Sequence, residues 1–278
     1  MDRGKLKKEE KQSIAEKLPN IDKIQHIVGC FLPDFISLQF HHNSTFPIGA
    51  ICLKDATRML SESRLALFEA YVNKLWYSKK NDRNSKYLKV FFVKYYADDI
   101  TLRLYAAAEH LANAILYMLE IEPSIVPKSK SRSSQASRVG KYLIKEYNTN
   151  PITKSIIELI ESEEWRVITA YRNKWVHDQP PLIEGNGIVW KRKILWESDG
   201  KEVRPGVITR RISFGGGDKP DLTISMLLEY THKALDKFAK TTEVIVEYYK
   251  SKILENEKKT QNKGMRFQVG ASINKLLK

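Results

Sequence analysis

The sequence predicts a mainly α protein, namely a helical bundle with an N-terminal helical extension and one inserted β-hairpin. Apolar residues recur at three- and four-residue intervals over most of the chain after residue 53, which is the period of an amphipathic helix. A two-residue alternation is clear only between residues 187 and 214, where turn residues interrupt it. The chain has 278 residues, which is enough to enclose one large core.

Seven helices are expected, and each is bounded by a break in the apolar pattern. Their approximate ranges are 4–18, 53–77, 84–97, 100–119, 135–147, 152–177 and 223–256. Pro47 and Gly49 interrupt the pattern before the second helix, and residues 24–40 favour irregular structure. Asp98 and Asp99 are placed to cap the helix that follows them, because a carboxylate accepts hydrogen bonds from free backbone N–H groups.

The β-hairpin is expected from residues 187–196 and 207–214, with its turn at residues 198–200. Alternation places Trp190 and Trp196 on one face, where we expect them to pack on the bundle. Basic side chains of the hairpin are candidates for RNA contact, because they can bind phosphates beside aromatic rings that stack on bases. These candidates are Lys191, Lys193 and Arg210.

The composition favours a polyanionic partner. The formal net charge is +14 and the sequence pI is near 9.5. Nucleic acid is favoured over a membrane surface, because no segment joins a basic face to a strongly apolar one; the alternative is a lysine-rich surface without a specific polyanion. Cys30 and Cys52 are too few for a zinc site, so no metal or cofactor is expected. A charged start and the lack of a long apolar run favour a cytoplasmic protein that does not enter a membrane.

The segment most informative about function is Tyr-Arg-Asn-Lys-Trp-Val-His at residues 171–177. An arginine can hold a phosphate through two hydrogen bonds, and a histidine can transfer protons near neutral pH. Arg172 and His177 are five residues apart, so on an α-helix their side chains point about 140° away from each other. A site that uses both therefore needs a distorted helix end or a second copy of the chain. Arg103 and His110 form a second arginine–histidine pair in the most apolar helix; they are seven residues apart and therefore lie on one face of it.

These residues also allow a purely structural interpretation. His177 can act as a cation at the C-terminal end of a helix, where it interacts favourably with the helix dipole. Arg172 can then pair with a surface carboxylate, and the candidates are Glu163, Glu164 and Asp178. For His110, a core histidine bonded to a polar neighbour is the commoner arrangement.

The motif Arg172-Asn173-x-x-x-His177, near the end of a long helix, resembles the signature of the HEPN superfamily. This resemblance covers about residues 100–256 and implies a helical bundle that forms a homodimer, in which two such motifs meet in a shared cleft. It also implies metal-independent RNA cleavage, with the RNA's own 2′-hydroxyl as the attacking group. His177 would then act as general base or acid and Arg172 would stabilise the charged transition state. Asn173 would orient the histidine or the phosphate.

The resemblance implies further site residues and partners. Polar side chains of the most apolar helix would form a second wall of the cleft, and the candidates are Glu109, His110 and Asn113. RNA is the expected substrate, and an antitoxin or another defence protein is a candidate partner. Toxin members paired with nucleotidyltransferase antitoxins carry a tyrosine two residues after the histidine, whereas this chain has Gln179, which excludes regulation through that tyrosine. The alternative within the superfamily is a non-catalytic module that binds RNA or a nucleotide, or assembles with other proteins.

The expected organisation has three parts. Residues 1–98 form the N-terminal helical extension, and residues 99–256 form the HEPN-like helical bundle with the β-hairpin 187–214 inserted. Residues 257–278 form a basic tail that is expected to be poorly ordered.

Overall fold

The computed structural model describes residues 6–29, 40, 43–80, 82–128, 134–177, 183, 194–204, 207–214 and 222–262. Helices account for most of these residues, so the prediction of a mainly α fold is confirmed. The helices are α1 (Lys8–Glu16), α2 (Ile21–Gly29), α4 (Phe46–Ser78), α5 (Arg83–Met118), α6 (Gln135–Glu146), α7 (Pro151–Ile160), α8 (Glu163–His177) and α9 (Ile224–Asn262), and a 3-10 turn, η2, spans Pro123–Ile125.

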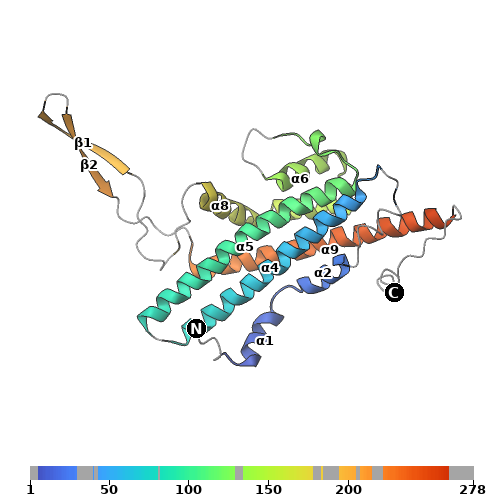
Figure 1. Cartoon of the computed structure of the whole chain (residues 1–278), viewed down its shortest axis with the longest axis horizontal. Coiled ribbons are helices and arrows are strands. Elements are labelled where there is room, and N and C mark those ends of the chain that lie inside the picture. The colour runs from blue at the N-terminus through green and yellow to red at the C-terminus, as the bar shows by residue number, and fades with distance from the viewer. Residues whose placement is uncertain are drawn as a thin grey trace.

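Three long helices form the centre of the fold. Helices α4 and α5 run antiparallel as a helical hairpin, and α9 packs against both of them (Figure 1). Fully buried aliphatic side chains line the contact, and their burial is the main favourable term in folding. They include Leu53, Leu60 and Leu67 of α4 and Ile100, Leu104 and Leu111 of α5. Phe238 and Tyr249 of α9 are fully buried as well.

Helix α4 begins at Phe46, before the two residues that were expected to interrupt the helical pattern. Pro47 lies in the first turn of this helix, where the N–H that proline lacks has no partner within the helix. A Cβ atom at Gly49 would lie 3.1 Å from the carbonyl oxygen of Ala114, so the glycine lets the α4 backbone approach α5 closely. The two residues expected to interrupt the helix therefore belong to it.

The N-terminal helices are tied to the bundle by side chains that reach backbone carbonyls. Arg64 of α4 donates a 2.9 Å hydrogen bond to the carbonyl oxygen of Pro19. His232 of α9 is hydrogen-bonded to the Lys17 carbonyl oxygen and to the Tyr71 hydroxyl, each at 3.1 Å. Helix α2 occupies part of the segment expected to be irregular, because Ile21, Ile24 and Val28 give it one buried face.

Three shorter helices pack against one part of this core. Helix α6 packs on α5, α7 on α6 and α9, and α8 on α5 and α9. The single helix expected over residues 152–177 is thus two helices, α7 and α8. The Oγ atom of Ser162 accepts a 3.1 Å hydrogen bond from the Trp165 N–H and donates a 2.7 Å bond to the Leu159 carbonyl oxygen. This serine ends one helix and caps the next.

Helix α5 requires the opposite correction, because it runs without a break through both segments expected at residues 84–97 and 100–119. Asp98 and Asp99 form side-chain pairs within the helix instead of capping it. Asp98 accepts a 2.6 Å hydrogen bond from Lys94, and Asp99 accepts a 2.8 Å bond from Arg103. The boundary expected between residues 98 and 99 falls inside this helix, and buried residues on both sides of it belong to one core.

Two strands are described between α8 and α9. Strand β1 (Ile194–Arg204) pairs antiparallel with β2 (Val207–Phe214), with Ile194 opposite Phe214. Residues 198–200, which were expected to form the turn, lie within β1. The register shifts after Ser198 and again after Glu202, and the strand continues beyond the expected turn to Arg204.

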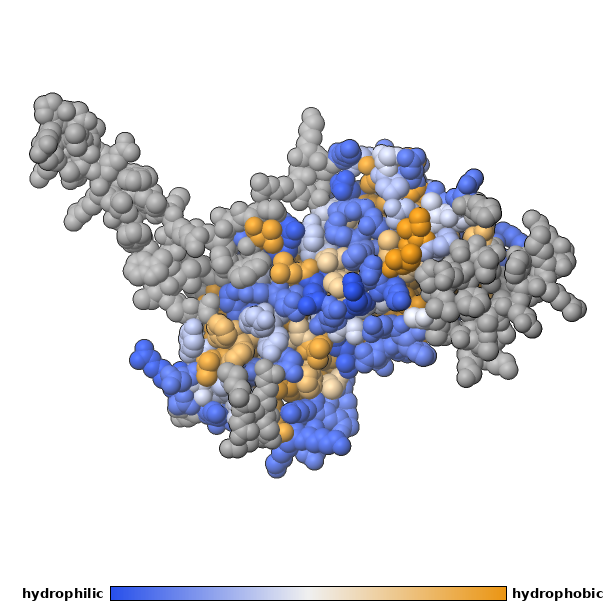
Figure 2. Space-filling model, viewed as in Figure 1, coloured by the Kyte–Doolittle hydropathy of each residue, from blue (hydrophilic) through white to orange (hydrophobic). Residues whose placement is uncertain are grey.

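Figure 2 shows hydrophilic residues over much of the described surface on one face, with hydrophobic patches between them. Within the described ranges, no helix combines the length and the apolar character needed to cross a membrane. Several large hydrophobic side chains are nevertheless exposed on α5, namely Tyr87, Phe91, Tyr95 and Leu102.

Candidate functional site

Tyr171 fixes helix α8 on helix α5. Its side chain is buried, and its hydroxyl donates a 2.5 Å hydrogen bond to Oδ1 of Asp98. The other carboxylate oxygen of Asp98 accepts a 2.6 Å bond from Lys94. Burial and the neighbouring Asp98 raise the pKa of Tyr171, so the phenol stays protonated as the donor. Arg172, the next residue along α8, is thereby held against α5.

Arg172 lies over the ring of Tyr105. Its guanidinium carbon is 4.3 Å from the ring centre, which is within the range of a cation–π contact. Arg172 also donates a 3.1 Å hydrogen bond to the side-chain oxygen of Asn173. Tyr105 in turn stacks on Trp165, with 5.9 Å between the ring centres. These contacts give the half-buried guanidinium a defined orientation.

Glu109 and Asn113, two of the residues predicted for the second wall, share a face of α5 with Tyr105, because consecutive members are four residues apart. Glu109 accepts hydrogen bonds of 2.9 and 3.3 Å from the N–H of Gln135, the first residue of α6. Asn113 accepts a 2.5 Å bond from the side-chain amide of the same Gln135. This face of α5 therefore binds the N-terminal end of α6.

Glu109 also interacts with two arginines. Burial raises the pKa of its carboxyl, while the N–H groups at the start of α6 and the charges of Arg138 and Arg172 act to lower it. Burial raises the pKa of Tyr105, and the charge of Glu109 adds to that effect. We call this group the Arg172 cluster; its members are Tyr105, Glu109, Asn113, Gln135, Arg138, Arg172 and Asn173. It offers a fixed cation, a carboxylate and amide groups between α5, α6 and α8.

The two predicted histidines occupy different places. His110 follows Glu109 on α5, and a turn of about 100° per residue directs it away from the face of the Arg172 cluster. His177 is the last residue of α8, and its side chain lies outside the described residues. The hairpin candidates Lys191 and Lys193 also lie outside them, and Arg210 is described only as part of the β2 backbone.

Two of the alternative partners of Arg172 are engaged elsewhere. Glu163 accepts a 2.9 Å hydrogen bond from the Tyr230 hydroxyl, and Glu164 lies 3.1 Å from the Lys237 ammonium group. Both contacts attach α8 to α9. The third alternative, Asp178, lies outside the described residues.

Arg103 belongs to a separate ion-pair network. It pairs with Asp99 on its own helix and with Glu62 of α4. Its partners are therefore carboxylates that hold α4 against α5. The pair Arg103 and His110, seven residues apart on one face of α5, is not part of the Arg172 cluster.

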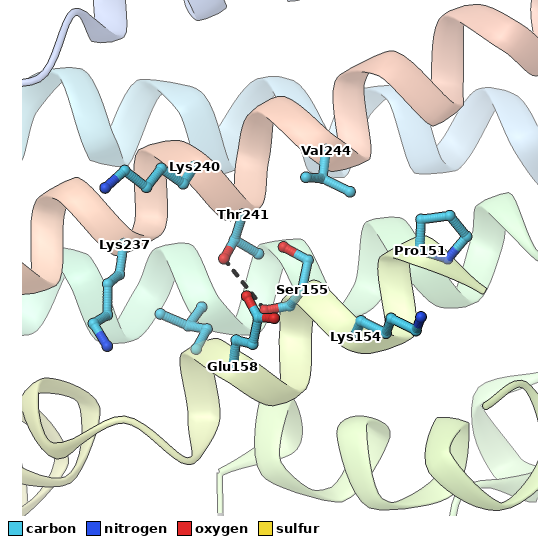
Figure 3. Close-up of a pocket in the computed structure, with 9 residues that line it drawn as sticks. Pro151, Lys154, Ser155, Glu158, Lys237, Lys240, Thr241 and Val244 are labelled. Carbon is cyan, nitrogen blue, oxygen red and sulfur yellow. Dashed lines mark hydrogen bonds between the residues drawn. The ribbon is translucent and has the colours of Figure 1, made fainter. Parts of the chain in front are cut away.

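A separate groove lies between α7 and α9 (Figure 3). Its volume is about 450 Å³, and Thr241 donates a 3.4 Å hydrogen bond across it to the Ser155 carbonyl oxygen. Two of its lysines, Lys237 and Lys240, are paired with carboxylates, which lowers their attraction for an anion. The residues that line this groove include none of those predicted for the site.

The described residues contain no group of three or more His, Cys, Asp or Glu side chains that could hold a metal ion. Cys52 is half-buried, and burial raises the pKa of its thiol. A cysteine that stays protonated is a poor nucleophile. It therefore adds no candidate site.

Sequence reasoning missed three members of the Arg172 cluster. Tyr105 lies four residues before Glu109, so the helical period could have indicated it. Gln135 and Arg138 lie in the first turn of α6, and no spacing in the sequence relates them to α5 or α8. Their proximity depends on how α6 packs.

Comparison with family models, with curated proteins and with solved structures finds no match to this chain.

Proposed function

We propose that this chain is a metal-independent endoribonuclease of HEPN type with a toxin or defence role, which acts as a homodimer. The observation that carries the proposal is the position of Arg172 and Asn173 beside Tyr105 and Glu109. An arginine held in a defined orientation is suited to bind a phosphate through two hydrogen bonds. Its place in an Arg-Asn-x-x-x-His motif at the end of α8 supports RNA as the phosphate source.

The chemistry needs only the RNA and side chains of this protein. His177 accepts the proton of a 2′-hydroxyl, and the oxygen attacks the adjacent phosphorus. The bond to the 5′-oxygen breaks, and the protonated His177 acts as acid and returns the proton to that oxygen. The products end in a 2′,3′-cyclic phosphate and a 5′-hydroxyl. Arg172 stabilises the extra negative charge of the phosphorane-like transition state.

A second copy of the chain can bring an arginine and a histidine together, which one copy cannot do. Arg172 and His177 point about 140° apart on a regular helix, and α8 is helical through both positions. In a two-fold dimer the same patch of each copy faces the other. We therefore propose that Arg172 of one copy works with His177 of the other. Glu109 would position Arg172 within each copy.

The alternative is a non-catalytic HEPN-type module that binds RNA or a nucleotide, or assembles with other proteins. The contacts of Arg172 with Tyr105 and Asn173 are compatible with this alternative, because they would also orient an arginine that only binds a phosphate. The basic hairpin residues Lys191, Lys193 and Arg210 serve RNA contact in either case. An antitoxin or another defence protein is the proposed partner.

RNA cleavage in the presence of EDTA separates these functions. We expect the wild type to give products with 2′,3′-cyclic phosphate ends, and Arg172→Ala and His177→Ala to lose at least about a hundredfold in rate. Both variants must melt like the wild type. Equal cleavage by all three proteins would assign the activity to another site, and binding without cleavage on any RNA would favour the non-catalytic module.

A further inference from the structure

The end of the α4–α5 hairpin at which α4 finishes (Ser78) and α5 begins (Arg83) combines positive charge with aromatic rings. Between Glu69 and Asp98 the chain has seven Lys or Arg residues, eight Phe, Trp or Tyr residues and one acidic residue, Asp82. Asp82 caps α5 and accepts a 2.8 Å hydrogen bond from the Ser85 N–H. Lys79 and Lys94 are paired with Glu10 and Asp98, and positive charges still outnumber negative ones in this segment.

Basic side chains crowd one another here. Burial and the charge of Lys89 lower the pKa of Lys74. Lys79 is paired with Glu10 of α1. Three further basic residues are exposed, namely Lys80, Arg83 and Lys86. A polyanion bound at this end would relieve the repulsion between these cations.

Three exposed aromatic side chains form a stripe along α5 at this end. Tyr87, Phe91 and Tyr95 are 54%, 44% and 61% exposed, and their spacing of four residues puts them on one face. The rings of Tyr87 and Phe91 are 6.2 Å apart at 25°. Phe91 also meets Phe92 edge to face at 5.3 Å, and Phe92 stacks on the buried Tyr77. The stripe is thus supported from the core.

The aromatic stripe continues into the Arg172 cluster. Tyr95, Leu102, Tyr105 and Glu109 follow one another at seven, three and four residues, so all lie on one face of α5. Asp98, which binds Tyr171 of α8, lies on the same face between Tyr95 and Leu102. Phe91 and Tyr105 are fourteen residues apart, which corresponds to about 21 Å along a helix. A nucleic-acid strand of a few nucleotides can span that distance.

We propose that the aromatic stripe of Tyr87, Phe91 and Tyr95 binds single-stranded RNA and leads it along α5 to the Arg172 cluster. The choice of RNA as the bound nucleic acid rests on the proposed function. Aromatic rings at the same end of a helix as exposed basic side chains suit single-stranded nucleic acid, because bases stack on the rings while phosphates contact the charges. The charge of this end and the absence of exposed aliphatic side chains between residues 83 and 95 distinguish it from a surface for a second protein.

Binding of a fluorescein-labelled 2′-O-methyl oligouridine, measured by anisotropy, tests the proposal without cleavage, because this probe lacks the attacking hydroxyl. The triple variant Tyr87→Ala, Phe91→Ala, Tyr95→Ala is expected to bind about tenfold more weakly or worse. The variant Tyr87→Phe, Phe91→Tyr, Tyr95→Phe is expected to bind within about twofold of the wild type, since every ring is kept. Ile144→Ala, at an α6 residue also 44% exposed, is the matched control and is expected to bind like the wild type.

The charges remain in all these variants, so the dependence of binding on salt should not change in the triple alanine variant. Equal affinity of that variant and the wild type would overturn the proposal. If equal affinity came with a lower sedimenting mass, the stripe would be an interface between copies of the chain. Absence of probe binding by the wild type would overturn it too.

The two proposals fail separately. Binding through the stripe by a protein that cuts no RNA would uphold this inference and contradict the nuclease. Cleavage that depends on Arg172, with probe binding unaffected by loss of the rings, would uphold the nuclease and contradict the aromatic stripe as an RNA-binding surface.

Discussion

The guanidinium carbon of Arg172 lies 4.3 Å from the centre of the Tyr105 ring. Tyr105 stacks on Trp165, and Trp165 meets Phe238 of α9 edge to face at 5.8 Å. The orientation of the arginine is therefore linked to the core through a column of rings from three helices. Because catalysis depends strongly on placement, this column is where the fold can affect the proposed chemistry at a distance from the phosphate.

The Tyr105 ring, rather than its hydroxyl, should support the activity. Tyr105→Phe keeps the ring under Arg172, so RNA cleavage should stay within about twofold of the wild type. Tyr105→Leu removes it, and a misplaced arginine should lower kcat by about tenfold to a hundredfold. Steady-state cleavage of a short fluorogenic RNA would measure both variants. Equal rates for the phenylalanine and leucine variants would show that the ring does not position Arg172.

Removal of the Tyr171 hydroxyl should destabilise the protein. Tyr171→Phe leaves one partly buried oxygen of Asp98 without its donor, which should lower the free energy of unfolding by about 1–3 kcal/mol. Tyr230→Phe is the matched control, because Tyr230 donates to Glu163 at the exposed surface, where the change should stay within about 0.5 kcal/mol. Urea denaturation at neutral pH would compare the two. Similar losses would mean that the bond to Asp98 does not hold α8 on α5.

The Glu109 carboxyl should give stability a distinct dependence on pH. Burial raises its pKa in the folded protein, so its contribution is present at low pH and is lost as the pH rises through that value. The wild type should therefore lose stability relative to Glu109→Gln as the pH rises from the usual value for glutamate through the raised pKa of the folded protein. Thermal melting of both proteins across this range would test the sign.

Glu255 supplies the opposite case. A hydrogen bond from Lys252 lowers the pKa of Glu255. The wild type should therefore gain stability relative to Glu255→Gln as the pH rises from below that lowered pKa to the usual value for glutamate, and should keep the gain at higher pH. If both variants shifted in the same direction, the assignment of Glu109 to a buried site would be wrong.

Local sequence patterns were sufficient to predict where most helices lie, but not where each helix begins and ends. The apolar period predicted the region of α4, α5, α6 and α9, because apolar side chains recur along each of them at helical spacing. Ser162 divides a continuous apolar pattern by capping α8, and its short polar side chain leaves no mark on that pattern. Asp98 resembles a cap in sequence, but the fold uses its carboxylate to bind Tyr171 and Lys94.

The candidate site shows the same division. The Arg172–His177 motif and the wall residues Glu109 and Asn113 could be picked out by residue type and helical spacing. The contact of Arg172 with Tyr105 could not, because it depends on the angle at which α8 crosses α5. Gln135 joins the cluster for the same reason, through the packing of α6.

The most direct test of the account is complementation between two inactive variants. Arg172→Ala and His177→Ala would be co-expressed with different tags, and the mixed dimer would be purified through both tags. If Arg172 of one copy acts with His177 of the other, this dimer has one complete site of two and should cleave RNA at about half the wild-type rate, while each variant alone is inactive. A mixed dimer as inactive as its parents would contradict the shared site.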